Sequence, residues 1–196
     1  MLITIKNLIG TPLLSLQTGQ PLGQIDSAIV DPRNLKILAF FCSGPMIEFQ
    51  PAVIYASDIR EFGQMGAIID SVDKILPLDD LVRLKEVLDF GFVLDGIRVI
   101  DDHKNKLGKV SNYTLDPNSF LIQQLIVTPT FMRSLSMASL TISRRQIKEV
   151  SNAHVVVKAP TIPVRDRTET NSTNLSPKLS NPFRKPKTAP NDIDRT

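Results

Sequence analysis

The sequence predicts a mainly β protein, in which a short helix joins two tandem small antiparallel β-barrels and a disordered C-terminal tail follows. Three observations predict this fold: an internal repeat, short β-forming runs between turn signals, and a change of composition after Lys158. We place the first barrel at residues 1–76, the linking helix at 77–90, the second barrel at 91–158 and the tail at 159–196.

The internal repeat has two turn motifs at one constant offset. Leu22-Gly-Gln-Ile25 recurs as Leu107-Gly-Lys-Val110, and Asp31-Pro32 recurs as Asp116-Pro117, each 85 positions later. The apolar run that follows the second motif also matches at this offset. After an insertion of three residues, the segment 58–62 falls on 146–150 and the segment 67–69 on 155–157. Matched turns and matched apolar runs at a fixed spacing indicate a duplicated structural unit.

Each repeat predicts consecutive short strands. In the first repeat we expect strands at 10–15, 23–30, 36–42, 46–55 and 67–70. In the second repeat we expect strands at 97–100, 108–115, 120–127, 140–143 and 155–157, with a polar hairpin turn at 101–106. Asp31-Pro32 predicts a type I turn, because the Asp side chain caps backbone N–H groups and Pro fixes φ. The third strand, 36–42, is apolar on both faces, which is typical of a strand covered on both sides.

The segment between the repeats has helical spacing. Leu81, Leu84 and Leu88 fall on one face of a helix, and Asp79 or Asp80 can cap its first turn. Phe90-Gly91 provides a stop signal. We expect a short amphipathic helix that packs on a barrel and fixes the relative position of the repeats.

The charge and composition of the chain change in the tail. Residues 160–196 hold six of the fourteen prolines and few large apolar side chains, so they cannot bury enough surface to offset the entropy of ordering. Seven basic and four acidic residues follow Lys158, which accounts for the whole net charge of +3. A formally neutral body does not predict a phosphate-tracking groove.

The repeated unit resembles the PRC-barrel family of small β-barrels. The resemblance rests on three motifs in each copy and covers residues 5–72 and 91–158. These motifs are 19–25, 31–32 and 57–60 in the first copy, and 106–110, 116–117 and 143–147 in the second. Members of that family include the cytoplasmic part of a photosynthetic reaction-centre subunit and the second domain of a ribosome-maturation factor. The resemblance implies docking onto a larger assembly without a catalytic centre.

Sequence signals for chemistry are few. Cys42 is the single cysteine and lies in an apolar run, so it is expected in the core and cannot form an internal disulfide. Asp101-Asp-His103 lacks the spacing of calcium or zinc sites and is expected to be a solvated turn. Phosphate-loop and nucleophile-elbow motifs are absent from the sequence. We therefore expect a non-enzymatic protein with no cofactor and no metal.

The expected function is that of an interaction or adaptor protein. Two segments carry candidate partner-docking residues: Phe131, Met132, Leu135 and Met137 in one connection between strands, and Phe183, Arg184, Lys185 and Lys187 in the tail. The alternatives are that the connection packs on the barrels and that the tail is inert. Protein partners are the first expectation, an RNA- or ribosome-associated factor the second, and a ligand- or metal-responsive regulator the third. Neither a secretory signal nor a transmembrane stretch is visible, which favours a cytoplasmic location; the sequence leaves the oligomeric state open.

Overall fold

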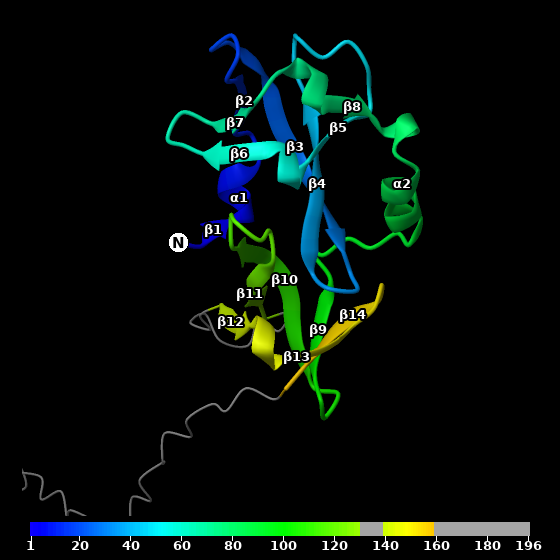
Figure 1. The fold of residues 1–196 in the computed structure, drawn as a ribbon. Helices are drawn as coiled ribbons and strands as arrows, with labels where there is room; N and C mark the ends of the chain where they lie inside the picture. Colours follow the sequence, from blue (N-terminus) through cyan, green and yellow to red (C-terminus); the bar gives the residue numbers. More distant parts are fainter. Residues whose placement is uncertain (130–138, 159–196) are drawn as a thin grey trace, which may run out of the picture. The chain divides into compact units, whose positions relative to one another are not determined.

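The chain is mainly β, as the sequence predicts (Figure 1). The computed structural model describes residues 1–129 and 139–158, which belong to one compact unit. Their strands form two seven-stranded sheets. No helix in these two ranges is long and apolar enough to cross a membrane.

The first sheet is built from residues 12–77 in the strand order β6-β7-β2-β3-β4-β5-β8. Short hairpins and two 3₁₀ turns, η1 (Ala56–Asp58) and η2 (Val72–Lys74), connect its strands. The strands are β2 (Pro12–Ser15), β3 (Pro21–Asp31), β4 (Lys36–Ser43), β5 (Ala52–Tyr55), β6 (Ile59–Phe62), β7 (Ala67–Ile69) and β8 (Ile75–Pro77).

The second sheet has the order β12-β11-β10-β9-β14-β13, and the N-terminal strand β1 (Ile3–Thr4) pairs with β10. The first strand of the chain therefore joins the sheet that is made by the last third of the described residues. The other strands are β9 (Arg98–Asp101), β10 (Lys106–Leu115), β11 (Ile122–Thr128), β12 (Leu140–Ser143), β13 (Ile147–Val150) and β14 (His154–Val157), with the 3₁₀ turn η4 (Arg144–Gln146) between β12 and β13.

The two sheets repeat one topology. β2 to β7 correspond in order and pairing to β9 to β14, and the register follows the offsets seen in the sequence. Ile25 lies opposite Cys42 in the first sheet, and Val110 lies opposite Val127 in the second. A register shift follows directly after each of these pairs. It lies between Ile25 and Ser27 in β3, and between Val110 and Asn112 in β10. The duplicated structural unit predicted from the sequence is thus visible strand by strand.

Parallel pairing corrects one part of the predicted fold. The sequence predicts antiparallel barrels, but β2 pairs parallel to β7, and β9 pairs parallel to β14. The cause is a long connection in each half that returns the chain to the first strand in the same direction. Both sheets are therefore mixed.

The predicted strand pattern needs two further corrections. Strand β5 begins at Ala52 rather than at Met46, because the chain crosses an irregular loop that ends at Pro51. The strands β6 and β13 were not predicted, since each has only four residues and two of these are exposed and charged.

Helix α2 (Val82–Asp89) follows the 3₁₀ turn η3 (Leu78–Asp80) and packs on the outer face of the first sheet. Leu84 and Val87 form a small core with three residues of that sheet, Ile29, Ala39 and Val53. The predicted cap is wrong: Leu81 occupies the N-cap without a side-chain hydrogen bond. The predicted stop is confirmed, because Phe90 is the C-cap and Gly91 follows with φ +62°.

The main hydrophobic core extends through both halves of the chain. It holds Leu13, Ile25 and Phe40 from the first sheet together with Tyr113 and Leu125 from the second. Strand β4 contributes to this core from one face and to the α2 core from the other, as its uniformly apolar sequence predicts. The short N-terminal helix α1 (Ile5–Leu8) also buries its apolar side chains in the main core.

Candidate docking surfaces

The eight docking residues predicted from the sequence lie outside the described residues. Four of them belong to the connection between β11 and β12, and four to the tail. They are Phe131, Met132, Leu135 and Met137 in the connection, and Phe183, Arg184, Lys185 and Lys187 in the tail. The surfaces that the structure does place arise where the two halves meet.

The halves meet through the turns that follow β3 and β10. The N–H of Ile37 donates to the carbonyl of Phe120 at 2.9 Å, and the N–H of Ile122 donates to the carbonyl of Leu35 at 2.9 Å. Ile37 and Ile122 are equivalent in the repeat, and so are Leu35 and Phe120. The contact is therefore reciprocal, as in an isologous dimer interface, but lies within one chain.

Aromatic packing reinforces this contact. The ring of Phe120 meets the rings of Phe40 and Phe62 edge to face, with centroids 6.5 Å and 6.1 Å apart. Leu35 and Phe120 both adopt positive φ, 47° and 58°, a conformation that non-glycine residues seldom adopt. The two equivalent turns therefore share one backbone conformation, and each of them hydrogen-bonds to the other half.

Arg144 breaks the internal symmetry. Its Nη1 donates to the carbonyls of Leu35 (3.4 Å) and Ile122 (3.1 Å), and its Nη2 donates to the carbonyl of Asn34 (2.6 Å). The guanidinium thus ties η4 to the first half. The equivalent residue of the first half is Ala56, which has no side chain that could make these bonds.

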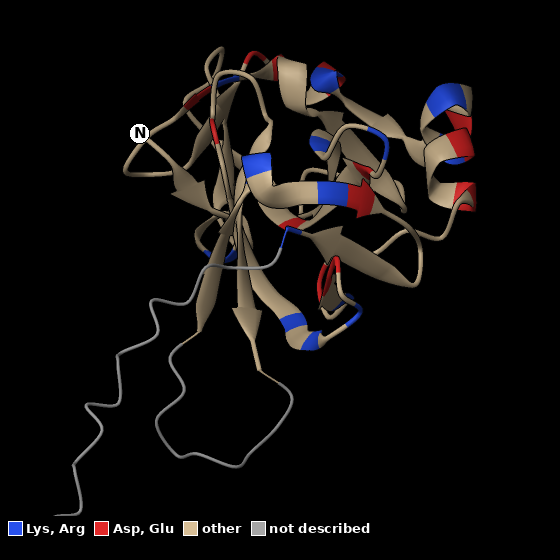
Figure 2. Ribbon diagram, turned by 90° about the horizontal axis from the view of Figure 1, so that it is seen from below, with Lys and Arg blue, Asp and Glu red and all other residues tan. Residues whose placement is uncertain are grey.

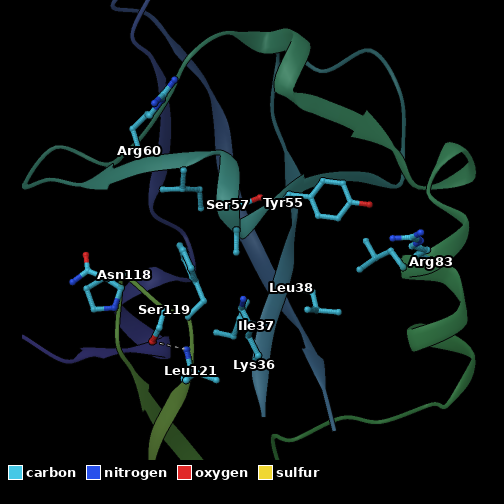
Figure 3. Close-up of a pocket in the computed structure, with 15 residues that line it drawn as sticks. Lys36, Ile37, Leu38, Tyr55, Ser57, Arg60, Arg83, Asn118, Ser119 and Leu121 are labelled. Atoms are coloured by element: carbon cyan, nitrogen blue, oxygen red, sulfur yellow. Dashed lines mark hydrogen bonds between the residues drawn. The ribbon is translucent and has the colours of Figure 1, made fainter. Parts of the chain in front are cut away.

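A groove of about 900 Å³ opens on the side where Ala56 stands (Figure 3). Tyr55 and Arg83 lie on one side of it and Asn118 on the other, so both halves contribute to its walls. Lys36, Arg60 and Arg83 border the groove, and none of the described residues that line it is acidic. Arg60 is held by Asp70 through two hydrogen bonds of 2.8 and 2.9 Å, and these lower the pKa of that carboxyl.

A second groove, of about 390 Å³, lies between α1, β3 and the segment 87–95 and is mainly apolar. Ile9 and Val93 on its walls keep 42% and 68% of their surface exposed, so they can still gain from burial. Tyr113 of β10 also lines it, and burial raises the pKa of its hydroxyl. Its equivalent in β3 is Ala28, whose small side chain leaves space in the groove.

An unpaired strand edge borders this apolar groove. In the second sheet, β1 pairs with the end of β10, where Ile3 lies opposite Leu115. The equivalent of Leu115 in the first sheet is Val30, and no strand within the described ranges pairs with that end of β3 on the corresponding side. The backbone there resembles an edge that accepts an additional strand.

Hydrogen bonds or burial explain the titratable side chains that the sequence singles out. Asp101 is buried and accepts hydrogen bonds from the N–H groups of His103 and Asn105 and from the Asn105 side chain, which lower the pKa of its carboxyl. Asp79 accepts a hydrogen bond from Lys85 rather than capping α2. Cys42 is buried in the core, as predicted, and this burial raises the pKa of its thiol to about 12. Among residues 1–129 and 139–158 no group of three His, Cys, Asp or Glu side chains could hold a metal ion.

No protein-family model matches the sequence, and a search of curated proteins finds no match. The family resemblance stays a prediction. The repeat makes Leu35 equivalent to Phe120, and Ala56 equivalent to Arg144, but it does not indicate that these residues lie where the two halves meet.

Proposed function

We propose that this chain is a non-catalytic docking protein of the tandem PRC-barrel type, and that the apolar groove beside β3 receives an extended segment of a partner protein. The observation that carries this proposal is the combination of exposed Ile9 and Val93 with the unpaired end of β3 in one place. Apolar anchors supply affinity, and a free strand edge supplies main-chain hydrogen bonds.

The second sheet supports this mode of binding by analogy within the chain. There the corresponding edge of β10 takes up Ile3-Thr4, a short extended segment with one apolar and one polar side chain. A partner segment of the same alternating character, paired beside Val30, would direct its apolar side chains towards the groove. The proposed ligand is thus an apolar–polar alternating strand of a protein.

The reciprocal contact between the halves favours tight binding. The groove has walls from both halves, and the hydrogen bonds of Ile37 and Ile122 fix these walls before a partner arrives. When the walls of a site are already ordered, binding does not have to offset the free energy of ordering them, and affinity is higher.

Site-specific photo-crosslinking of the full chain in cells tests this function. A benzoylphenylalanine at Val93 should yield defined protein adducts, whereas the same group at Val82 should not. The two residues are matched, because each is 68% exposed and only Val93 lines the groove. Ala28→Tyr, which copies Tyr113 into the groove, should reduce the Val93 adducts at least tenfold. Equal adducts from both positions, or adducts that Ala28→Tyr leaves unchanged, would contradict the proposal.

A further inference from the structure

The two halves of the folded region carry opposite net charges. Residues 1–90 hold seven basic and eleven acidic side chains, a net charge of −4. Residues 91–158 hold nine basic and five acidic side chains, a net charge of +4. Figure 2 shows the basic residues in blue and the acidic residues in red along the ribbon. Residues 1–158 have a net charge of zero because the charges of the two halves cancel, and the second half carries an excess of positive charge.

Part of this excess is gathered on the surface of three neighbouring strands. Lys109 of β10 lies opposite Arg98 of β9, and Arg98 lies opposite His154 of β14. Lys106 borders the same shallow depression of about 300 Å³. We call Arg98, Lys106, Lys109 and His154 the basic strip. No acidic side chain is among the described residues that line the depression, although Glu149 lies on the neighbouring strand β13.

The charged side chains of the basic strip, Arg98, Lys106 and Lys109, have no counter-ions in the described part of the chain. None of the four side chains makes an ion pair or a hydrogen bond there, whereas the nearby Lys148 is bound to Asp102 at 2.7 Å. Like charges directly opposite each other on adjacent strands destabilise a sheet. The pair Arg98 and Lys109 therefore costs stability in the free protein, and an anionic ligand would relieve that cost.

The first half provides a comparison within the same molecule. The positions equivalent to Arg98, Lys106, Lys109 and His154 are occupied by neutral residues. Strand pairing identifies them as Pro12, Pro21, Gln24 and Gly66, since Gln24 lies opposite Pro12 as Lys109 lies opposite Arg98. Because the backbone pairing is the same in both sheets, the fold does not require cations at these positions. The basic strip is specific to the second copy.

Apart from Val93, which lines the apolar groove, the second half lacks exposed large apolar side chains in its described part. The large apolar side chains that are more than about a third exposed all belong to residues 1–93. They are Met1, Leu2, Ile9, Leu16, Met46, Phe49, Met65, Val72, Val82, Phe90 and Val93. A surface with cations and without apolar anchors suits a polyanion better than a protein segment, since protein partners take most of their affinity from buried anchors.

We propose that the basic strip binds the phosphate backbone of RNA. Neighbouring strands lie about 4.8 Å apart, so Lys109, Arg98 and His154 form a row about 10 Å long across the sheet. A nucleic-acid strand carries a charge about every 3.4 Å along its axis. An extended acidic peptide presents side chains to one face only about every 6.7 Å. The two charged members of the row, Lys109 and Arg98, lie one strand spacing apart, which is closer to the spacing of phosphates than to that of peptide side chains.

Binding at the strip is independent of base sequence and sensitive to salt. No Phe, Tyr or Trp is among the described residues that line the depression, which disfavours base stacking as the source of affinity. Each phosphate neutralised on a single strand contributes about 0.7 to the slope of log affinity against log salt. Removing two cations lowers that slope by about 1.4.

Fluorescence anisotropy with the full chain and a labelled 20-nucleotide RNA of mixed sequence tests the proposal. The double variant Arg98→Gln/Lys109→Gln should bind about tenfold more weakly or worse at 50 mM salt, with the shallower salt slope. The control is Lys36→Gln/Arg83→Gln, which removes the same charge from the groove of Figure 3 and should bind as the unchanged protein does. Far-UV circular dichroism establishes that both variants fold.

Three results would overturn the assignment. Equal RNA binding by the strip variant and the unchanged protein would place any RNA contact elsewhere. Polyglutamate of equal charge that binds as tightly as the RNA, with the same loss in the strip variant, would identify an acidic protein segment instead. Vesicles of phosphatidylserine and phosphatidylcholine that bind through the strip more tightly than the RNA does would identify a membrane surface. The crosslinks from Val93 are unaffected by any of these results, so the two proposals are tested separately.

Discussion

At the scale of single residues, the aspartates that begin the two equivalent turns explain why the repeat keeps its Asp-Pro motif. The carboxylate of Asp31 accepts a hydrogen bond from the N–H of Arg33 at 3.0 Å. The carboxylate of Asp116 accepts one from the hydroxyl of Ser119 at 2.6 Å and one from the N–H of Asn118 at 3.4 Å. At Asp116 the hydrogen bonds favour the charged form, and the one from Ser119 is the main reason that the pKa of this carboxyl is lowered.

This lowered pKa predicts how stability depends on pH. A carboxyl whose pKa is lower in the folded state than the unfolded value of about 3.9 stabilises the protein above that value. The stabilisation is lost as the pH falls through the folded-state pKa. Asp116→Asn should therefore lower the free energy of unfolding at pH 7 and reduce its decline between pH 5 and pH 2, measured by urea unfolding. Asp80→Asn serves as the control, because Asp80 is exposed and makes no side-chain hydrogen bond to a described residue. A decline equal to that of the unchanged protein would contradict the account.

Residue-level features were predictable where the interactions are local. The turn at Asp31-Pro32 follows from a side chain that reaches its own backbone two residues on, which needs no knowledge of the rest of the chain. The positive φ of Leu35 and Phe120 does not follow from residue type, since neither is glycine or asparagine. Each residue ends the turn of a hairpin, and Lys104 adopts the same conformation in the turn after β9.

At the scale of secondary-structure elements, several strands were predictable from their apolar and turn pattern, whereas β1, β6 and β13 were not. The predicted strand 140–143 coincides with β12, and the third strand, 36–42, differs from β4 by one residue. The strand β1 has only two residues, and it forms because the end of β10 offers it an edge. Such a strand depends on a partner strand more than 100 positions away in the sequence, so no local sequence pattern predicts it.

Arg144, in the 3₁₀ turn η4, donates hydrogen bonds to three carbonyl groups where the two halves meet. These bonds predict how much stability is lost when the side chain is removed. Arg144→Ala should destabilise the protein by about 1–3 kcal/mol, since partly buried acceptors lose their donor. Arg145→Ala, at the exposed neighbouring position, should change stability by less than about 0.5 kcal/mol. Thermal or urea unfolding measures both, and equal losses would show that the hydrogen bonds of Arg144 contribute nothing.

At the scale of the whole molecule, duplication could be predicted from the sequence, but the contact between the copies could not. The repeat determines which strands correspond, and each copy folds by the same turns and apolar runs. The linking helix was expected to set the relative position of the copies. Instead α2 packs on the first sheet, and the reciprocal turns join the halves. Recognising this required the structure, because a repeat carries no information about how its copies meet.

The shared core predicts that the two halves unfold together. Phe120 belongs to the second half yet packs on Phe40 and Phe62 of the first, and β1 leaves the first half to pair with β10. Unfolding either half alone would expose the apolar surface of the other, which favours a single cooperative transition. In a Tyr55→Phe background, fluorescence reports Tyr113 of the second half, and alkylation of Cys42 reports the first half.

Both probes should give the same midpoint in urea, and calorimetry should give equal calorimetric and van't Hoff enthalpies. Phe120→Ala should lower both midpoints together, by about 3–5 kcal/mol in the free energy of unfolding, because the cavity lies in a core that both halves share. Two separate midpoints, or a loss confined to the Tyr113 signal, would mean that the copies are independent domains. The walls of the apolar groove could then move apart, and the preformed docking site proposed above would lose its basis.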